Sequence, residues 1–373
     1  MKVVIGTQSK EKLKRFKELF KGIPIEFLLV SDLGINEGIE ETGDSVNENA
    51  MLKAAYYAKK TGLPCMSLDS GLFFIDYPKE DPIQVLAHVK SPKGIALNPI
   101  QMKEYYQQLA HEYGGCLKAS WIDAYALYYQ GEIKVIDNEK WARKDAQLTI
   151  LDHEVNEWNE EYPIECIRIP ALRKSDSTLF YNRMISEFSQ VLGIELARRV
   201  EVEEYNPQWE QLFNKERMLL QEILKNKALA IYHIGSTSVK GLKAKPIIDI
   251  LIVVSQIEEM DCYQEMFEFQ GYEYLGEYGI AQRRYLRKRK IINGEWVDLF
   301  HLHIFDEDAQ EEIERHLAVS KYLNAFSLEA KEYGDLKQKL SLLYPYDIEA
   351  YCDGKDEFVQ KLEQRAIKWW KLK

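Results

Sequence analysis

A turn near the start of the chain carries residue types suited to binding phosphate. Thr7, Ser9 and Lys12 stand where an apolar strand pattern gives way to a helix pattern. Backbone N–H groups and the helix dipole attract anions at the start of a helix, and a lysine adds a positive charge. The turn therefore predicts a phosphate-binding loop, although a hydroxyl residue at a helix start is more often simply an N-cap.

Three further segments supply acidic and basic side chains in a fixed order. Glu41 closes an acidic pair before a glycine, Lys53 lies in a helix pattern, and Asp69 and Ser70 open a further strand. Carboxylates hold a hard cation such as Mg²⁺, and lysine neutralises charge on a phosphate. Each segment alone is a common turn or a solvated face. Their joint occurrence indicates phosphoryl-transfer or phosphate-ester chemistry.

A separate constellation lies in the second half of the chain. Gly235 and Ser236 end one strand pattern, and Asp249 lies inside the next apolar run. Nucleotidyltransferase folds use this spacing to hold a triphosphate and Mg²⁺. A carboxylate in an apolar strand must be paired, hydrogen-bonded or metal-bound. His301 and His303 share one strand face, so they are either metal ligands beside Asp249 or ordinary satisfied histidines.

Basic residues near this constellation could line an anion pocket. They are Lys240, Lys243, Lys245, Arg283 and Arg284. We predict substrate contacts for Lys245 and Arg284 in particular. Solvated loop charges are the alternative, and the sequence leaves both open.

The elements that must position these residues alternate between strands and helices. Strands are predicted over 2–6, 119–129, 131–136, 164–169, 228–234 and 247–254, and helices over 11–20, 47–61, 179–192 and 209–225. This order predicts an α/β fold, with a basic hairpin running through 285–303. A break in the pattern near 194–200 divides the chain into two predicted domains, 1–195 and 200–373.

Composition argues against several classes of protein. The net charge is −11, without the broad basic surface that a nucleic-acid polymer requires. No apolar stretch approaches the about 20 residues of a membrane-spanning helix. The five cysteines are scattered without a C-x-x-C pair, which disfavours a disulfide framework or a cysteine zinc site. No signal-peptide pattern opens the chain, so the cytoplasm is the expected location.

Residues 1–75 resemble the inosine-triphosphate pyrophosphatase family, which hydrolyses non-canonical purine nucleoside triphosphates, and the match extends tolerably to about residue 145. The resemblance is carried by the segments Glu40-Glu41-Thr42-Gly43, Glu48-Asn49-Ala50, Lys53-Ala54 and Asp69-Ser70-Gly71-Leu72. It implies a long twisted mixed sheet with two lobes and a bound Mg²⁺. It also implies that water attacks the α-phosphorus and releases pyrophosphate and a nucleoside monophosphate.

The resemblance also assigns roles to residues of this chain. Seven positions take them: Thr7, Ser9 and Lys12 in the triphosphate loop, Glu41 at Mg²⁺, Lys53 at phosphate, Asp69 at the metal or as the base, and Ser70 at substrate. Lys12, Lys53 and Asp69 are the predicted catalytic residues. Members of that family commonly form dimers, so a homodimer is compatible with the resemblance.

Several positions depart from the pattern of that family. Leu68 stands where the family has a second aspartate, and His88, in the segment 82–88, stands where it has an arginine. The purine-stacking F-G-Y-D segment and the S-H-R signature are not found. These departures leave purine specificity open and keep an inactive or re-purposed homologue as an alternative.

Residues 201–373 resemble the GrpB family over nearly their whole length. The matching segments are 205–209, 233–238, 245–249, 276–280, 283–285, 301–303, 315–317 and 321–323. The resemblance implies a nucleotidyltransferase-like α/β fold without a settled activity. Leu251 stands where a working transferase usually carries a second carboxylate.

The sequence as a whole predicts a Mg²⁺-dependent nucleoside-triphosphate pyrophosphatase domain joined to a GrpB domain. Its expected partner is a nucleoside triphosphate, with no nucleic-acid polymer and no membrane. One alternative is a nucleotide-binding sensor whose domains have both lost their chemistry, as Leu68 and Leu251 suggest. Another is nucleotidyl transfer by the second domain, at Asp249. The preferred base and sugar, cooperation between the domains and the oligomeric state stay open.

Overall fold

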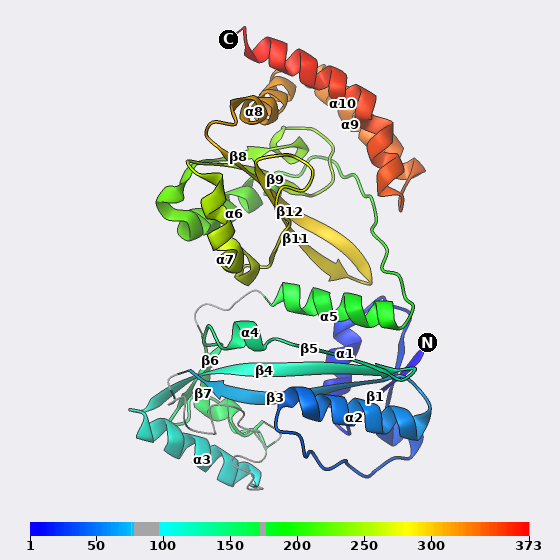
Figure 1. Cartoon of the computed structure of the whole chain (residues 1–373), viewed down its shortest axis with the longest axis vertical. Coiled ribbons are helices and arrows are strands. Elements are labelled where there is room, and N and C mark those ends of the chain that lie inside the picture. The colour runs from blue at the N-terminus through cyan, green and yellow to red at the C-terminus, as the bar shows by residue number, and fades with distance from the viewer. Residues whose placement is uncertain (76, 78–96, 161, 172–176, 373) are drawn as a thin grey trace. The chain divides into compact units, whose positions relative to one another are not determined.

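The computed structural model describes residues 1–75, 77, 97–160, 162–171 and 177–372. The chain forms two compact units, Met1–Glu195 and Leu196–Lys373, and each is mixed α/β with its own sheet (Figure 1). The predicted α/β class with two domains is thereby confirmed. The segment 82–88, with His88, lies outside the described residues.

The first unit is built on a mixed sheet. Its described strands are β1 (Lys2–Ile5), β2 (Glu26–Leu29), β3 (Cys65–Phe74), β4 (Cys116–Tyr129), β5 (Glu132–Asp137), β6 (Leu148–Leu151) and β7 (Arg168–Pro170). Their order is β2-β1-β3-β4-β6-β7, with β5 paired to β4. The pairs of β1 with β2 and β3 are parallel, and the remaining pairs are antiparallel.

The described helices of the first unit are α1 (Lys10–Leu19), η1 (Val30–Leu33), α2 (Val46–Thr61), α3 (Pro99–Glu112), α4 (Glu139–Ala142), η4 (Glu165–Ile167) and α5 (Thr178–Val191). Three of them, α1, α2 and α3, begin at residues whose side chains cap them. Ser45 caps α2 by accepting from the Glu48 N–H, and Gly62 ends the helix in the left-handed conformation. Small residues such as Ala50 and Ala54 let α2 pack closely on β4.

The strand predicted over 164–169 is wrong in its first half. The segment forms the short helix η4, and only Arg168–Pro170 joins the sheet as β7. The carbonyl of Cys166 accepts hydrogen bonds from the N–H groups of Val155 and Asn156. The apolar pattern therefore indicated burial of this segment but not a strand. The Cys166 carbonyl, which a neighbouring strand would have paired, is hydrogen-bonded to a loop instead.

The second unit has a five-stranded sheet in the order β10-β11-β12-β9-β8. The strands are β8 (Ala228–Ile234), β9 (Ile248–Val254), β10 (Tyr272–Tyr274), β11 (Arg283–Ile292) and β12 (Glu295–Asp306). β9 and β12 are parallel, and the other pairs are antiparallel. The predicted basic hairpin is present as β11 and β12.

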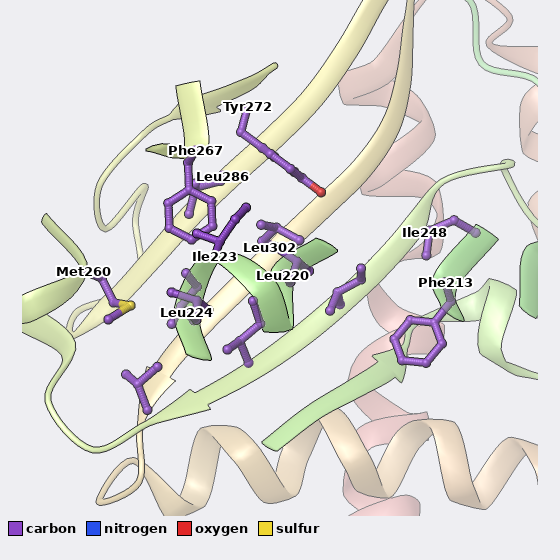
Figure 2. Packing of buried hydrophobic residues seen from close by; sticks show 14 of the residues in the cluster. Phe213, Leu220, Ile223, Leu224, Ile248, Met260, Phe267, Tyr272, Leu286 and Leu302 are labelled. Atoms are coloured by element: carbon purple, nitrogen blue, oxygen red, sulfur yellow. The ribbon is translucent and has the colours of Figure 1, made fainter. Parts of the chain in front are cut away.

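Helices cover both faces of this second sheet. They are α6 (Gln208–Leu224), η5 (Lys225–Lys227), η6 (Ser236–Ser238), η7 (Ile257–Tyr263), α7 (Gln264–Phe269), α8 (Gln310–Ala325), α9 (Ser327–Leu343) and α10 (Ile348–Trp370). Figure 2 shows the main core, where Leu220 and Leu224 of α6 meet Leu286 and Leu302 of the hairpin. No helix in the described part of the chain is long and apolar enough to cross a membrane.

Alternation along β9 assigns its residues to two faces. Ile248 and Ile250 belong to the core under α6, while Leu251 belongs to a smaller cluster with Ile313 of α8. Because side chains alternate along a strand, Asp249 shares its face with Leu251. The carboxylate is therefore on the side of the sheet that α8 covers.

Candidate functional site

A buried lysine joins the two predicted acidic residues of the first unit. The Lys53 Nζ lies 2.6 Å from Asp69 Oδ1 and 3.1 Å from Glu41 Oε1. The side chains of Lys53 and Asp69 are 8% and 7% exposed, whereas that of Glu41 is 43% exposed. Asp69 Oδ2 is also buried and has no hydrogen-bond partner among the described residues. Three residues from separate segments thus form one charged cluster with an unsatisfied oxygen.

The start of α2 holds the acidic segment in place. The Gly43 N–H donates to Asn49 Oδ1 at 2.8 Å, and Asn49 is fully buried. A Cβ atom built at Gly43 would lie only 2.7 Å from the Glu48 Cβ, so a larger residue would force the loop away from the helix. This contact explains the glycine two residues after Glu41. It fixes the loop that carries the carboxylate.

The predicted phosphate loop is a capped helix start. Ser9 caps α1, since its Oγ accepts from the Lys12 N–H at 3.3 Å, and Thr7 Oγ1 accepts from the Ser9 N–H at 3.1 Å. The Lys12 Nζ donates to the Leu68 carbonyl at 2.9 Å. Lys12 therefore reaches β3 at the residue before Asp69. Phosphate contacts of Thr7 and Ser9 stay predictions.

Ser70 does not share a face with Asp69. Residues alternate along β3, and the Ser70 Oγ donates to Asp123 Oδ1 at 2.6 Å on the other side. Arg15 donates to Asp123 Oδ2 at 2.6 Å and to the Tyr181 hydroxyl at 2.9 Å. Sequence reasoning missed this network. An aspartate inside the apolar run of β4 was the signal that could have found it.

The first cluster fits a magnesium ion in its chemistry. Among the described residues, no three or more His, Cys, Asp and Glu side chains form a group that could hold a metal. Mg²⁺ is commonly held by one or two carboxylates together with water and substrate phosphates. Glu41 and the unsatisfied Oδ2 of Asp69 are two such donors. Mg²⁺ binding at these residues stays a prediction.

The second constellation gathers around Asp249. Its Oδ1 lies 3.2 Å from His301 Nδ1 and 3.9 Å from His303 Nε2. Burial alone would raise the pKa of Asp249, but these two histidines outweigh it and hold the pKa well below its ordinary value. Burial lowers the pKa of His303. The three predicted metal ligands are thus brought together, with both histidines within ion-pair distance of one carboxylate oxygen.

The Gly235–Ser236 turn packs directly on this carboxylate. Gly235 has φ +68°, and a Cβ atom there would lie 2.3 Å from Asp249 Oδ2. Only glycine allows so close an approach at that backbone conformation. Ser236 Oγ accepts a hydrogen bond from the Lys337 Nζ at 2.8 Å, and Lys337 was not predicted from the sequence.

The predicted cations divide into two groups. Burial lowers the pKa of Lys245, and the Asp249 charge acts on it. Arg284 instead pairs with both carboxylate oxygens of Asp261, at 2.7 and 2.8 Å, and Lys243 pairs with acidic residues nearby. Arg284 and its strand partner Ile304 share the face opposite Asp249. The structure therefore keeps Lys245 near Asp249 and does not bring Arg284 there.

Comparison with known proteins assigns the second unit. The GrpB protein family model matches residues 199–365. The glutamate-rich protein GrpB of Alkalihalophilus pseudofirmus is 32% identical over 160 residues, which are 42% of this chain and 90% of that protein. The chain belongs to the GrpB family. The UPF0157 protein YqkA of Bacillus subtilis is 40% identical over 174 residues, 47% of this chain and 49% of YqkA, so the chain spans about half the length of that relative.

A solved structure is similar to part of this chain. The conserved protein GrpB from Enterococcus faecalis is 45% identical and covers 46% of this chain and 99% of its own, with a TM-score of 0.43.

The first unit matches a different family. The Ham1 family model matches residues 3–113. The dITP/XTP pyrophosphatase of a Thermoanaerobacter strain is 44% identical over 73 residues, which are 20% of this chain and 37% of that enzyme. Both predicted resemblances are confirmed: a Ham1-like unit precedes a GrpB unit.

Proposed function

We propose that the first unit hydrolyses nucleoside triphosphates to a nucleoside monophosphate and pyrophosphate, with Mg²⁺ as cofactor. The observation that carries the proposal is the Lys53 bridge between Asp69 and Glu41, which leaves one buried Asp69 oxygen without a partner among the residues that the structure describes. The likeness of residues 3–113 to the Ham1 family supports it. Non-canonical purine nucleotides are the proposed substrates, since the matched relative is named for dITP and XTP.

The proposed reaction assigns a task to each residue of the cluster. Asp69 Oδ2 accepts a proton from the attacking water, whose oxygen forms a bond to the α-phosphorus. The bond from the α-phosphorus to the bridging oxygen breaks, and its electron pair leaves with pyrophosphate. Lys12 and Lys53 stabilise negative charge on the phosphates. Mg²⁺, held by Glu41, would supply further neutralisation of the phosphate oxygens. Binding of the metal by Asp69, in place of the role of base, is the alternative for that carboxylate.

The test is pyrophosphate release from a panel of purine and pyrimidine triphosphates with Mg²⁺. We expect turnover of dITP or XTP, and a loss of about 100-fold or more in Asp69→Asn, which removes the base. Asp44→Asn is the matched control, because Asp44 is an exposed aspartate in the same acidic loop region. No turnover on any nucleotide, or equal turnover in Asp69→Asn and wild type, would reject the hydrolase.

A nucleotide sensor without catalysis is the second candidate for the whole chain. Two apolar residues favour it: Leu68, beside Asp69, and Leu251, beside Asp249 on the same strand face. Tight nucleotide binding that is insensitive to Mg²⁺ and shows no turnover would favour the sensor. Transfer of a labelled nucleotidyl group that is abolished by Asp249→Ala would instead assign a transferase activity to the GrpB unit.

A further inference from the structure

Three lysines of the GrpB unit converge from separate elements and form what we name the lysine cluster. Lys245 precedes β9, Lys337 lies on α9 and Lys355 lies on α10. Lys337 is 3% exposed, and its Nζ lies over the Tyr333 ring at 4.4 Å. The Nζ atoms of Lys245 and Lys355 lie 5.4 and 5.2 Å from the centre of one ring, that of Tyr351. The cluster therefore joins α9 and α10 to the segment that precedes β9.

The lysine cluster has no ion-pair partner in the described part of the chain. None of its three ammonium groups lies within ion-pair distance of a described carboxylate, whereas the nearby Lys243 pairs with Glu204 and Asp335. The negative charge of Asp249 attracts Lys245 and Lys337 over a longer distance. That carboxylate already lies within ion-pair distance of His301 and His303. The positive charge of the cluster is thus only partly balanced by the residues that the structure describes.

A buried lysine without an ion-pair partner lowers the stability of the folded protein, because its ammonium group is desolvated. Its presence at this position therefore calls for a functional explanation. Burial, together with the positive charge of Lys355, lowers the pKa of Lys337 to about 7. An apolar residue at this position would avoid the cost of desolvating the ammonium group. An anionic ligand that binds there would recover it. Lys245 and Lys355 are only partly buried, which leaves the cluster in contact with solvent.

We propose that the lysine cluster and the Gly235–Ser236 turn form a binding site for a polyphosphate group. Cationic heads from three elements suit a ligand with several negative oxygens, and a buried ammonium suits a compact anion rather than a polymer. The turn is tied to the cluster through Ser236, whose Oγ accepts the hydrogen bond from the Lys337 Nζ. The ligand is pyrophosphate, tripolyphosphate or the triphosphate of a nucleotide.

The test is calorimetric titration of the full chain with orthophosphate, pyrophosphate, tripolyphosphate and ATP. Wild type is compared with Lys337→Met and with Lys339→Met, a control at an exposed lysine on the same helix. We expect Lys337→Met to weaken binding of at least one polyphosphate by about 10- to 100-fold, as for loss of a charged hydrogen bond. Lys339→Met keeps the wild-type affinity. Residues of the Ham1-like unit are the same in all three proteins, so the difference reports the lysine cluster.

Thermal unfolding separates a binding role from a structural one. We expect Lys337→Met without ligand to melt at or above the wild-type temperature, because an uncompensated charge has been removed. Tighter binding of ATP than of tripolyphosphate would assign the site to nucleotides, and equal binding would assign it to the inorganic chain. Should Lys337→Met fail to fold, Lys355→Met serves in the same titration. Equal polyphosphate affinity in wild type and the folded variant would overturn the proposal.

Discussion

Each unit of the chain buries a lysine, and the two lysines differ in their partners. Lys53 lies between the carboxylates of Asp69 and Glu41. Among the described residues, the Lys337 Nζ instead donates to the Ser236 hydroxyl and lies over the Tyr333 ring. A lysine that is neutralised within the protein stabilises the apo fold. A buried lysine without a carboxylate partner costs stability in the apo protein, and it can bind an anionic ligand. The same residue type therefore serves catalytic geometry in one unit and ligand capture in the other.

Among the substitutions that test this difference, Lys53→Met is expected to have the largest effect on stability. Lys53→Met removes the cation from a buried pair and leaves Asp69 without its partner. We expect the first unit to lose about 3–5 kcal/mol of unfolding free energy, as buried pairs do when one member is removed. Urea unfolding measures it, with Lys59→Met on the exposed face of α2 as control. A loss below that of the control variant would contradict the pairing.

Lys337→Met is expected to move stability in the opposite direction. Removing an unbalanced buried charge should stabilise the GrpB unit by about 1–4 kcal/mol, the range seen when a buried ion pair or triad is replaced by apolar residues of similar size. The measurement is urea unfolding without phosphate in the buffer. Destabilisation comparable to that of Lys53→Met would show that the two lysines are equivalent and remove the contrast.

The pH dependence of stability sharpens the comparison. Because the pKa of Lys337 is lowered to about 7, the unfolded chain holds a proton between about pH 7 and 10 that the folded chain lacks. The unfolding free energy of wild type should therefore rise with pH there, by up to about 1.4 kcal/mol per unit. Lys337→Met should lack that part of the rise.

Other titratable groups near Lys337 leave this direction unchanged. They are Lys245, Lys355, Asp249 and Tyr333. The pKa of Asp249 is held low by the two histidines, and burial raises that of Tyr333 to about 12, so neither changes charge in the window. Burial lowers the pKa of Lys245, which adds in the same direction. Polyphosphate affinity should fall as the pH rises, and equal profiles in both proteins would contradict the assignment to Lys337.

The smallest expected effect belongs to Ser9. Its hydroxyl caps α1, so Ser9→Ala should cost about 1 kcal/mol of stability through the lost cap. Ser9→Asp keeps a capping oxygen and adds negative charge near the proposed triphosphate. If Ser9 only caps the helix, Ser9→Asp retains wild-type turnover. If it lines the triphosphate loop, Ser9→Asp raises the KM for nucleotide in the pyrophosphate-release assay.

Local patterns made part of this architecture predictable. The order Glu41, Lys53, Asp69 predicted one cluster because a helix and the strand after it return to the same place, and the three side chains do meet. Lys337 was not predicted, because it comes from a helix 101 residues after Ser236 and has no spacing pattern with it. Arg284 belonged to a dense basic run, but strand alternation placed it beside Asp261.

The proposed hydrolysis requires water to attack the α-phosphorus at the Asp69 cluster. Hydrolysis of dITP or XTP in water enriched in heavy oxygen tests this directly, with Mg²⁺ present and Asp69→Asn alongside. We predict that the heavy oxygen enters the nucleoside monophosphate, that pyrophosphate is unlabelled, and that Asp69→Asn lowers the yield of both products by about 100-fold or more. Label in pyrophosphate, release of orthophosphate, or unchanged products from Asp69→Asn would contradict the account.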